Sequence, residues 1–305
     1  MQLLKSILPV FIASAILLAC SQQKPQSGDD GEILVFTSIP PLAYLVERIG
    51  GSGIKTDVLI QGGQDPHTFE PTPSQMAALS KADLFVTVGM PFEKVLVNKL
   101  ADNLGKSLTI VPTEQPIDAV QKSCEGACDH CQPDADQRDD PHIWLSPTLL
   151  IEQARIITDA LIKIDSTHAE TYRKNLVALE DEIRTLDKKI CEALAPFGGQ
   201  AFYVFHPAFG HFARSYNLIQ KPVETGGKSP TPKQLNDLIT RAKADSVRII
   251  FVQPQFDPTA AEKIAKSIGG VVVPLDPLAR DVLQNLEEMA DQIINALSVQ
   301  SSTNI

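Results

Sequence analysis

The tripeptide Asp-Pro-His occurs twice in this chain, ending at His67 and at His142, and a third histidine, His206, ends an apolar run. Imidazole is the commonest protein ligand for zinc-like metals. Each of the three lies where a strand-like or apolar segment meets a proline-containing loop, and α/β folds collect ligands in loops at strand ends. Three such histidines on separate segments predict one metal site assembled across the fold.

The other three histidines fit a ligand role less well. His211 lies five residues after His206, about 140° around a helix, so the two rings would not share a face. His168 falls in the first turn of a predicted helix, where we expect contact with solvent. His130 belongs to a cluster of cysteines.

A dication held by three neutral imidazoles calls for a carboxylate that offsets its charge. Asp276 is the best-placed candidate, because it follows the apolar run Val271–Val273. Asp257 is a weaker candidate, and Glu70 and Glu224 stay open as alternatives.

Strand-like and helix-like segments alternate in two similar halves of the chain. The expected strands cover residues 33–37, 57–60 and 84–88 in the first half and 201–205, 222–224, 247–252 and 271–276 in the second. Each half also contains a helix that opens on a Thr-Pro-x-Gln capping box, at Thr72 and at Thr231. The alternation predicts an α/β fold of two lobes, each with a mainly parallel sheet flanked by helices.

One long helix is predicted between the two lobes. Apolar residues recur every three or four positions from Ala169 to Leu194, which forms a single apolar stripe. Asp165 or Thr167 could cap its start. A length of about 45 Å would reach both lobes as a rigid linker, with a free coiled coil as the competing interpretation.

The N-terminus predicts export. Lys5 precedes an apolar run that is too short to span a bilayer and that ends at Ala19, directly before Cys20. This pattern resembles a lipobox, in which Cys20 is acylated, and an ordinary signal peptide is the alternative. We expect a protein anchored by lipid on the extracytoplasmic side of a membrane, in the periplasm or at the cell surface.

The length of the chain indicates how many domains it has, and its net charge limits the kinds of partner it can bind. About 285 mature residues exceed the usual size of one core. We therefore divide the chain into a signal peptide (1–19), a flexible tether (20–31), an N-terminal lobe (32–147), linker helices (148–197) and a C-terminal lobe (198–305). The net charge of −10 argues against a nucleic-acid partner.

A cysteine-rich acidic loop occupies about residues 116–140. It contains Cys124, Cys128, His130 and Cys131, followed by several aspartates. These groups could form a secondary metal site, and an acidic loop with one incidental disulfide is the alternative. Cys191 lies in the predicted long helix, where we expect a packed thiol.

Four motifs together resemble the metal-binding lipoproteins of ABC importers for zinc and manganese. They are Asp65-Pro66-His67 with Glu70-Pro71-Thr72-Pro73, Asp140-Pro141-His142-Ile143-Trp144-Leu145, Phe205-His206-Pro207-Ala208-Phe209, and Leu275-Asp276-Pro277-Leu278. The resemblance runs from Ile33 to about Leu297 and implies a bilobal solute-binding protein with a helical backbone. It places the metal ligands on His67, His142, His206 and Asp276. The chain departs from the zinc-binding members in having cysteines where their loop is often rich in histidine.

The resemblance implies capture of Zn²⁺ rather than catalysis, with delivery to a membrane permease powered by a cytoplasmic ATPase. Members suited to manganese often carry a carboxylate at the position of His206, and a nitrogen-rich set favours zinc. Manganese is the main rival metal. A zinc hydrolase, with Glu70 as general base, and a surface adhesin are the alternatives from other classes. We expect a monomer.

Overall fold

The computed structural model describes residues 32–103, 108–114, 140–224 and 230–303. Several predicted features lie outside these residues: the signal peptide, the tether, the lipidation site Cys20, and the loop with Cys124, Cys128, His130 and Cys131. In the described part of the chain, no helix is long and apolar enough to cross a membrane.

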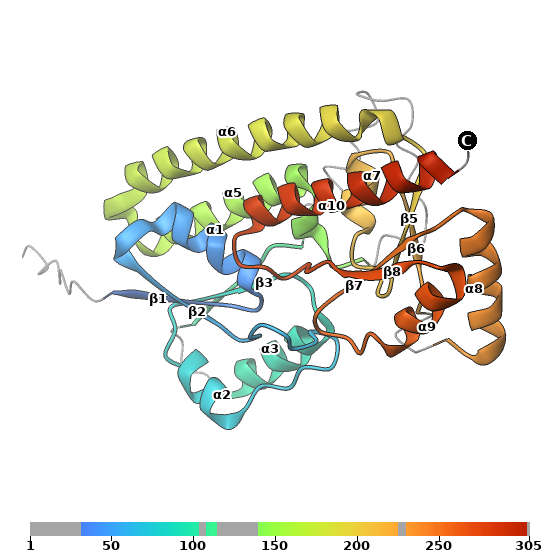
Figure 1. Ribbon diagram of the computed structural model, residues 1–305. Coiled ribbons are helices and arrows are strands. Elements are labelled where there is room, and N and C mark those ends of the chain that lie inside the picture. The colour runs from blue at the N-terminus through green and yellow to red at the C-terminus, as the bar shows by residue number, and fades with distance from the viewer. Residues whose placement is uncertain (1–31, 104–107, 115–139, 225–229, 304–305) are drawn as a thin grey trace, which may run out of the picture. The chain divides into compact units, whose positions relative to one another are not determined.

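The N-terminal lobe is a parallel four-stranded sheet in the order β2-β1-β3-β4, with helices between the strands (Figure 1). Its elements are β1 (Ile33–Thr37), α1 (Pro40–Gly50), β2 (Ile54–Val58), α2 (Pro73–Leu79), β3 (Leu84–Thr87), α3 (Pro91–Asn103) and β4 (Thr109–Pro112). Every residue of β3 is buried, because neighbouring strands and covering helices enclose it, and this explains its continuous apolar sequence.

The C-terminal lobe repeats this topology in the order β6-β5-β7-β8. Its elements are β5 (Ala201–Val204), α7 (Gly210–Ser215), β6 (Ile219–Pro222), α8 (Pro232–Ala244), β7 (Ile249–Val252), α9 (Thr259–Ile268) and β8 (Val271–Pro274). The capping boxes at Thr72 and Thr231 are both formed, with reciprocal hydrogen bonds to Gln75 and Gln234. The predicted fold class and the matching order of elements in the two halves are confirmed.

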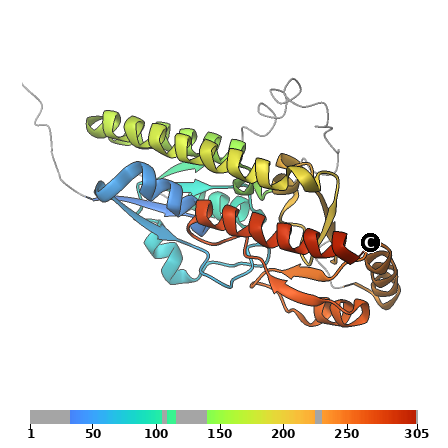
Figure 2. The same ribbon diagram turned by 45° about the horizontal axis from the view of Figure 1, so that its top comes forward.

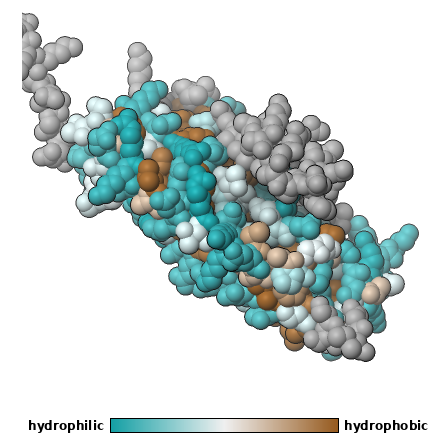
Figure 3. Space-filling view, turned by 90° about the horizontal axis from the view of Figure 1, so that it is seen from above, coloured by the Kyte–Doolittle hydropathy of each residue, from teal (hydrophilic) through white to brown (hydrophobic). Residues whose placement is uncertain are grey.

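Two helices lead from one lobe to the other. They are α5 (Pro147–Ile164) and α6 (Ala169–Leu194), preceded by the short helix η3 (Ile143–Leu145). The 26 residues of α6 give about 39 Å, and its buried residues follow the predicted stripe. Helix α6 packs on α1 and α5 and on the C-terminal helix α10 (Val282–Thr303), beside which it runs (Figures 1 and 2). Its outer face is mainly hydrophilic (Figure 3).

One hydrophobic core extends through both lobes. It joins the first sheet, α5, α6 and α10 to residues of the second sheet such as Phe202 and Phe251. A second, smaller cluster fills the space between the C-terminal sheet and helices α8 and α9. The two lobes are therefore tied by shared packing as well as by the long helix.

Several predicted details differ from the structure. The second strand is Ile54–Val58 rather than 57–60, and the short strand near 222–224 is Ile219–Pro222. The sequence interpretation missed α3 and β4. Cys191 is exposed, because it lies on the outer face of α6 rather than on its apolar stripe.

Candidate metal centre

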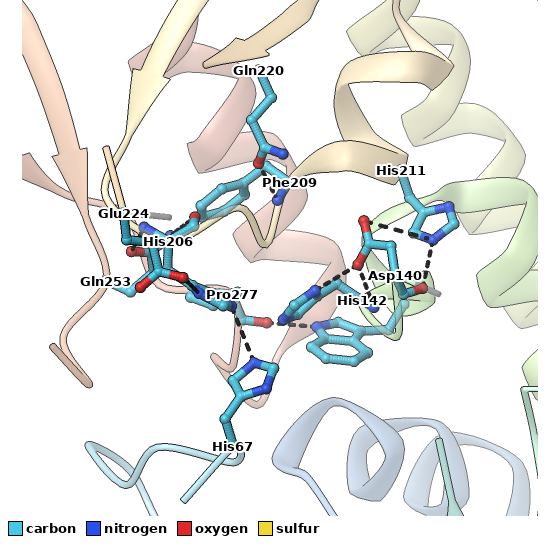
Figure 4. A network of polar contacts seen from close by, with 11 residues as sticks. His67, Asp140, His142, His206, Phe209, His211, Gln220, Glu224, Gln253 and Pro277 are labelled. Atoms are coloured by element: carbon cyan, nitrogen blue, oxygen red, sulfur yellow. Dashed lines mark hydrogen bonds and ion pairs between the residues drawn. The ribbon is translucent and has the colours of Figure 1, made fainter. Parts of the chain in front are cut away.

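Three histidines from separate segments converge on one point. His67 comes from the loop between β2 and α2, His142 directly precedes η3, and His206 follows β5. Each offers one ring nitrogen, and these three atoms all lie within 4.8 Å of one another (Figure 4). In the part of the chain that the structure describes, this is the one group of histidine, cysteine and acidic side chains close enough to share a metal ion.

The spacing of the rings suits a tetrahedral ion. Ligand nitrogens around tetrahedral zinc are separated by about 3.3 Å, given Zn–N bonds of about 2.0 Å. The Nε2 atoms of His67 and His206 lie 3.1 Å apart. The ring of His142 has its centroid 5.6 Å from that of His67 and 5.3 Å from that of His206. Small side-chain adjustments would bring all three nitrogens to one ion.

The two Asp-Pro-His segments form the same local turn. In each, the aspartate Oδ1 accepts a hydrogen bond from the backbone N–H of the histidine two residues later, at 2.9 Å for Asp65 and His67 and 3.0 Å for Asp140 and His142. Such Asx turns fix the backbone locally, and the intervening proline stiffens it. The repeated tripeptide therefore forms a rigid turn that fixes the position of a histidine in a loop.

Two carboxylates, the buried one of Glu224 and the largely covered one of Asp140, orient two of the three rings. Oε1 of Glu224 accepts a hydrogen bond from Nδ1 of His206 at 2.7 Å, and Oδ1 of Asp140 accepts one from Nδ1 of His142 at 2.6 Å. Each contact places the proton on Nδ1 and leaves Nε2 free to bind a metal. Burial opposes ionisation of Asp140, but the hydrogen bonds from the ring and backbone of His142 prevail and hold the pKa of Asp140 below its usual value.

The third ring, His67, has a different environment. It lies on an exposed loop, and no carboxylate of the described residues forms a hydrogen bond with its ring. Desolvation of the ring, followed by repulsion from His206 and His142, lowers the pKa of His67 to about 4. His67 is therefore neutral at physiological pH and can bind a cation without first losing a proton.

Mainly apolar side chains line the pocket beside the three rings. The pocket is lined by the histidines together with Pro66, Gln255, Phe256, Pro277 and Leu278. The ring of Phe256 stacks on His206 with centroids 4.9 Å apart. Surroundings of this kind exclude water and strengthen electrostatic interactions with a bound ion.

Asp276, the fourth predicted ligand, lies next to this pocket but outside the group of three ligand nitrogens. Its Oδ1 accepts hydrogen bonds from Nε2 of Gln255 and from the backbone N–H of Leu278, both at 2.9 Å. The indole N–H of Trp144, which is fully buried, donates to the carbonyl of Pro277 at 2.6 Å. The chain around Asp276 is thus fixed against the segment that carries His142.

The remaining candidates have other surroundings. Asp257 accepts hydrogen bonds from Thr259 at the start of α9, and Glu70 is exposed and is not among the residues that line the pocket. His168 is exposed and pairs with Asp165. The sequence interpretation missed the roles of Asp140 and Glu224: it treats Asp140 only as part of the Asp-Pro-His motif and Glu224 only as an alternative ligand.

Comparison with known proteins gives a consistent set of relatives. Residues 35–298 match the family model described as zinc-uptake complex component A, periplasmic. The chain is 27% identical over 311 residues to the high-affinity zinc uptake system protein ZnuA of Yersinia pestis, covering 95% of this chain and 94% of that protein. It is 29% identical over 292 residues to the zinc-binding lipoprotein AdcA of Streptococcus pneumoniae, covering 94% of this chain and 56% of that protein. A crystal structure of ZnuA superposes with a TM-score of 0.78 at 37% identity, covering 87% of this chain and 99% of that one.

Proposed function

The chain belongs to the family of periplasmic zinc-uptake components, and from this premise we propose that it captures Zn²⁺ outside the cytoplasm at His67, His142 and His206. The observation that carries the proposal is the convergence of three ring nitrogens within 4.8 Å of one another. Three neutral nitrogen donors in a small pocket suit zinc better than manganese, which prefers oxygen ligands.

Asp276 completes the coordination in this proposal. Pro277, Leu278 and Gln255 line the pocket, and Gln255 also donates a hydrogen bond to the Asp276 carboxylate. Because Oδ1 of Asp276 already accepts two hydrogen bonds, we propose that a small movement brings the other oxygen to the ion. Three nitrogens and one oxygen would then close a four-coordinate site.

The captured zinc passes to the permease of an ABC importer, which a cytoplasmic ATPase drives. Lipid on Cys20 would anchor the protein to the membrane, and residues 20–31 would tether the folded part near the permease. We propose that the protein acts as a monomer. The shared core of the two lobes supports release through small local movements rather than through wide opening of the lobes. A large change in radius of gyration between the metal-free and zinc-bound protein, measured by small-angle scattering, would contradict this.

A zinc hydrolase is less well supported. A catalytic zinc site keeps an open position and a general base beside it. Glu70, the candidate base, is exposed and does not line the pocket. Membership of a zinc-uptake family also assigns the chain to a binding component rather than to an enzyme.

Elemental analysis tests the proposed function. The purified protein is exposed to equal concentrations of Zn²⁺ and Mn²⁺, desalted and analysed for both metals, beside the variant His206→Ala. We expect about one zinc per chain for the wild type and a strongly reduced content for the variant. Preferential retention of manganese would favour the rival metal, and absence of bound metal in the wild type would contradict the proposal.

A further inference from the structure

His211 lies close to the metal centre without belonging to it. It is 3% exposed and lies on α7, five residues after His206. Its Nε2 lies 3.0 Å from the carbonyl oxygen of Asp140 and 3.9 Å from Oδ2 of the same residue (Figure 4). Burial lowers the pKa of His211, so the ring is neutral at physiological pH and donates one hydrogen bond to this carbonyl. His211 therefore contacts the residue that orients His142.

Asp140 is held from two sides. Its Oδ1 binds both the ring and the backbone N–H of His142, while its main chain accepts the hydrogen bond from His211. The first residue of α7 is Gly210, where a Cβ atom would lie only 2.7 Å from Oδ2 of Asp140. A side chain at Gly210 would thus displace the carboxylate that fixes the His142 ring.

Helix α7 also contacts the segment that follows His142. It packs on η3, and the hydroxyl of Ser215 donates to that of Ser146 at 3.2 Å. The loop from His206 to His211 consequently reaches the metal centre twice, once with a ligand and once through Asp140. These contacts connect His206 to His142 through the backbone from His206 to His211, the hydrogen bond from His211 to Asp140 and the hydrogen bond from His142 to Asp140.

We propose that His211 is a positioning residue of the zinc site, which holds Asp140, and through it the ring of His142, at the loop that carries His206. The proposal rests on the proposed zinc site and adds to it a support for the ring of His142 that comes from the loop carrying His206.

Three variants test this role. His211→Leu fills the space but removes the donor to Asp140. His211→Gln places an amide N–H near the position of Nε2 and should restore the hydrogen bond. Gly210→Ala leaves His211 intact and pushes the Asp140 carboxylate away from His142. The control is His168→Leu, which alters an exposed histidine that pairs with Asp165 at 2.7 Å.

Zinc affinity is measured by competition with a chelator, zinc release by stopped flow, and the tautomer of His142 in the metal-free protein by nitrogen-15 NMR. We expect His211→Leu and Gly210→Ala to bind zinc about tenfold more weakly, the lower end of the range for outer partners of metal ligands. Both should release zinc faster and lose the single Nδ1–H tautomer of His142, whereas His211→Gln and His168→Leu should resemble the wild type.

Wild-type affinity and an unchanged His142 tautomer in His211→Leu would overturn the proposal. If His211→Leu does not fold, His211→Phe, which also lacks the donor to Asp140, takes its place, while Gly210→Ala tests only whether the Asp140 carboxylate sets the His142 ring. Failure of the wild type to bind zinc would instead refute the proposed function, so the two outcomes are distinguishable.

Discussion

The Glu224 carboxylate offers a sharp test of how the protein supports a bound ion. It is 6% exposed and lies 2.7 Å from Nδ1 of His206. The substitution Glu224→Gln keeps the size of the side chain and an oxygen that can accept the Nδ1–H, but it removes the negative charge. The variant therefore separates charge from shape.

The expected loss of zinc affinity in Glu224→Gln follows from the distance between the Glu224 charge and the bound ion. The path from Glu224 to the metal crosses the hydrogen bond, the imidazole ring and a Zn–N bond, about 6 to 7 Å in all. At an effective dielectric constant of about 20, a dication and a unit negative charge at this distance attract each other by about 5 kcal/mol. Solvent and relaxation offset part of this, so we expect a loss of about 1.4 to 2.8 kcal/mol, or 10- to 100-fold in affinity.

Competition with a zinc chelator at neutral pH measures this loss. Asp165→Asn is the matched control, because it makes the same change of charge at another histidine–carboxylate pair. Asp165 pairs with His168, which is exposed and does not belong to the candidate metal centre. The control should bind zinc as the wild type does. A dissociation constant for Glu224→Gln within twofold of the wild type would refute the reasoning that an outer carboxylate balances the charge of the ion through His206.

Three further substitutions give separable readouts. Asp276→Ala should weaken zinc binding by about 10- to 100-fold in the same chelator assay if this carboxylate completes the site, and unchanged affinity would remove it from the ligand set. Trp144→Phe leaves the buried carbonyl of Pro277 without its donor and should lower the free energy of unfolding in urea by about 1–3 kcal/mol, whereas an unchanged midpoint would contradict the importance of this contact. Burial raises the pKa of Glu93 to about 7, so the folded state holds a proton there that the unfolded state has lost above a pH of about 4.5. The stability of the metal-free protein should therefore fall by up to about 3.4 kcal/mol as the pH rises from about 4.5 to about 7, relative to Glu93→Gln, and a pH-independent difference between the two proteins would show that Glu93 has an ordinary pKa.

Local signals made most of the fold predictable. The capping boxes at Thr72 and Thr231 depend on side chains within three residues of each other, so their sequence pattern is sufficient. The apolar stripe of α6 is equally local. Strand ends were less well placed, since β2 and β6 are edge strands whose alternating or mixed burial gives a weak apolar signal.

The convergence of the three histidines was predictable from the sequence, but the residues that orient their rings were not. The Asp-Pro-His tripeptides can be recognised because proline and an Asx turn act within three residues. By contrast, Glu224 reaches His206 across 18 positions and His211 reaches Asp140 across 71. Such partners depend on tertiary packing, between the neighbouring strands β5 and β6 for Glu224 and between α7 and the segment before η3 for His211, and a single sequence does not record that packing. His211 illustrates the limit, because its angle to His206 excluded it as a ligand without indicating its contact with Asp140.

X-ray absorption at the zinc edge of the zinc-loaded protein tests the central claim most directly. The number of imidazoles is obtained from multiple scattering, and sulfur ligands are recognised by their longer bonds of about 2.3 Å. We predict three imidazoles and one oxygen donor for the wild type, two imidazoles for any zinc that His206→Ala retains, and no sulfur in either. Two or fewer imidazoles in the wild type, or a sulfur shell, would contradict a zinc site built from His67, His142 and His206.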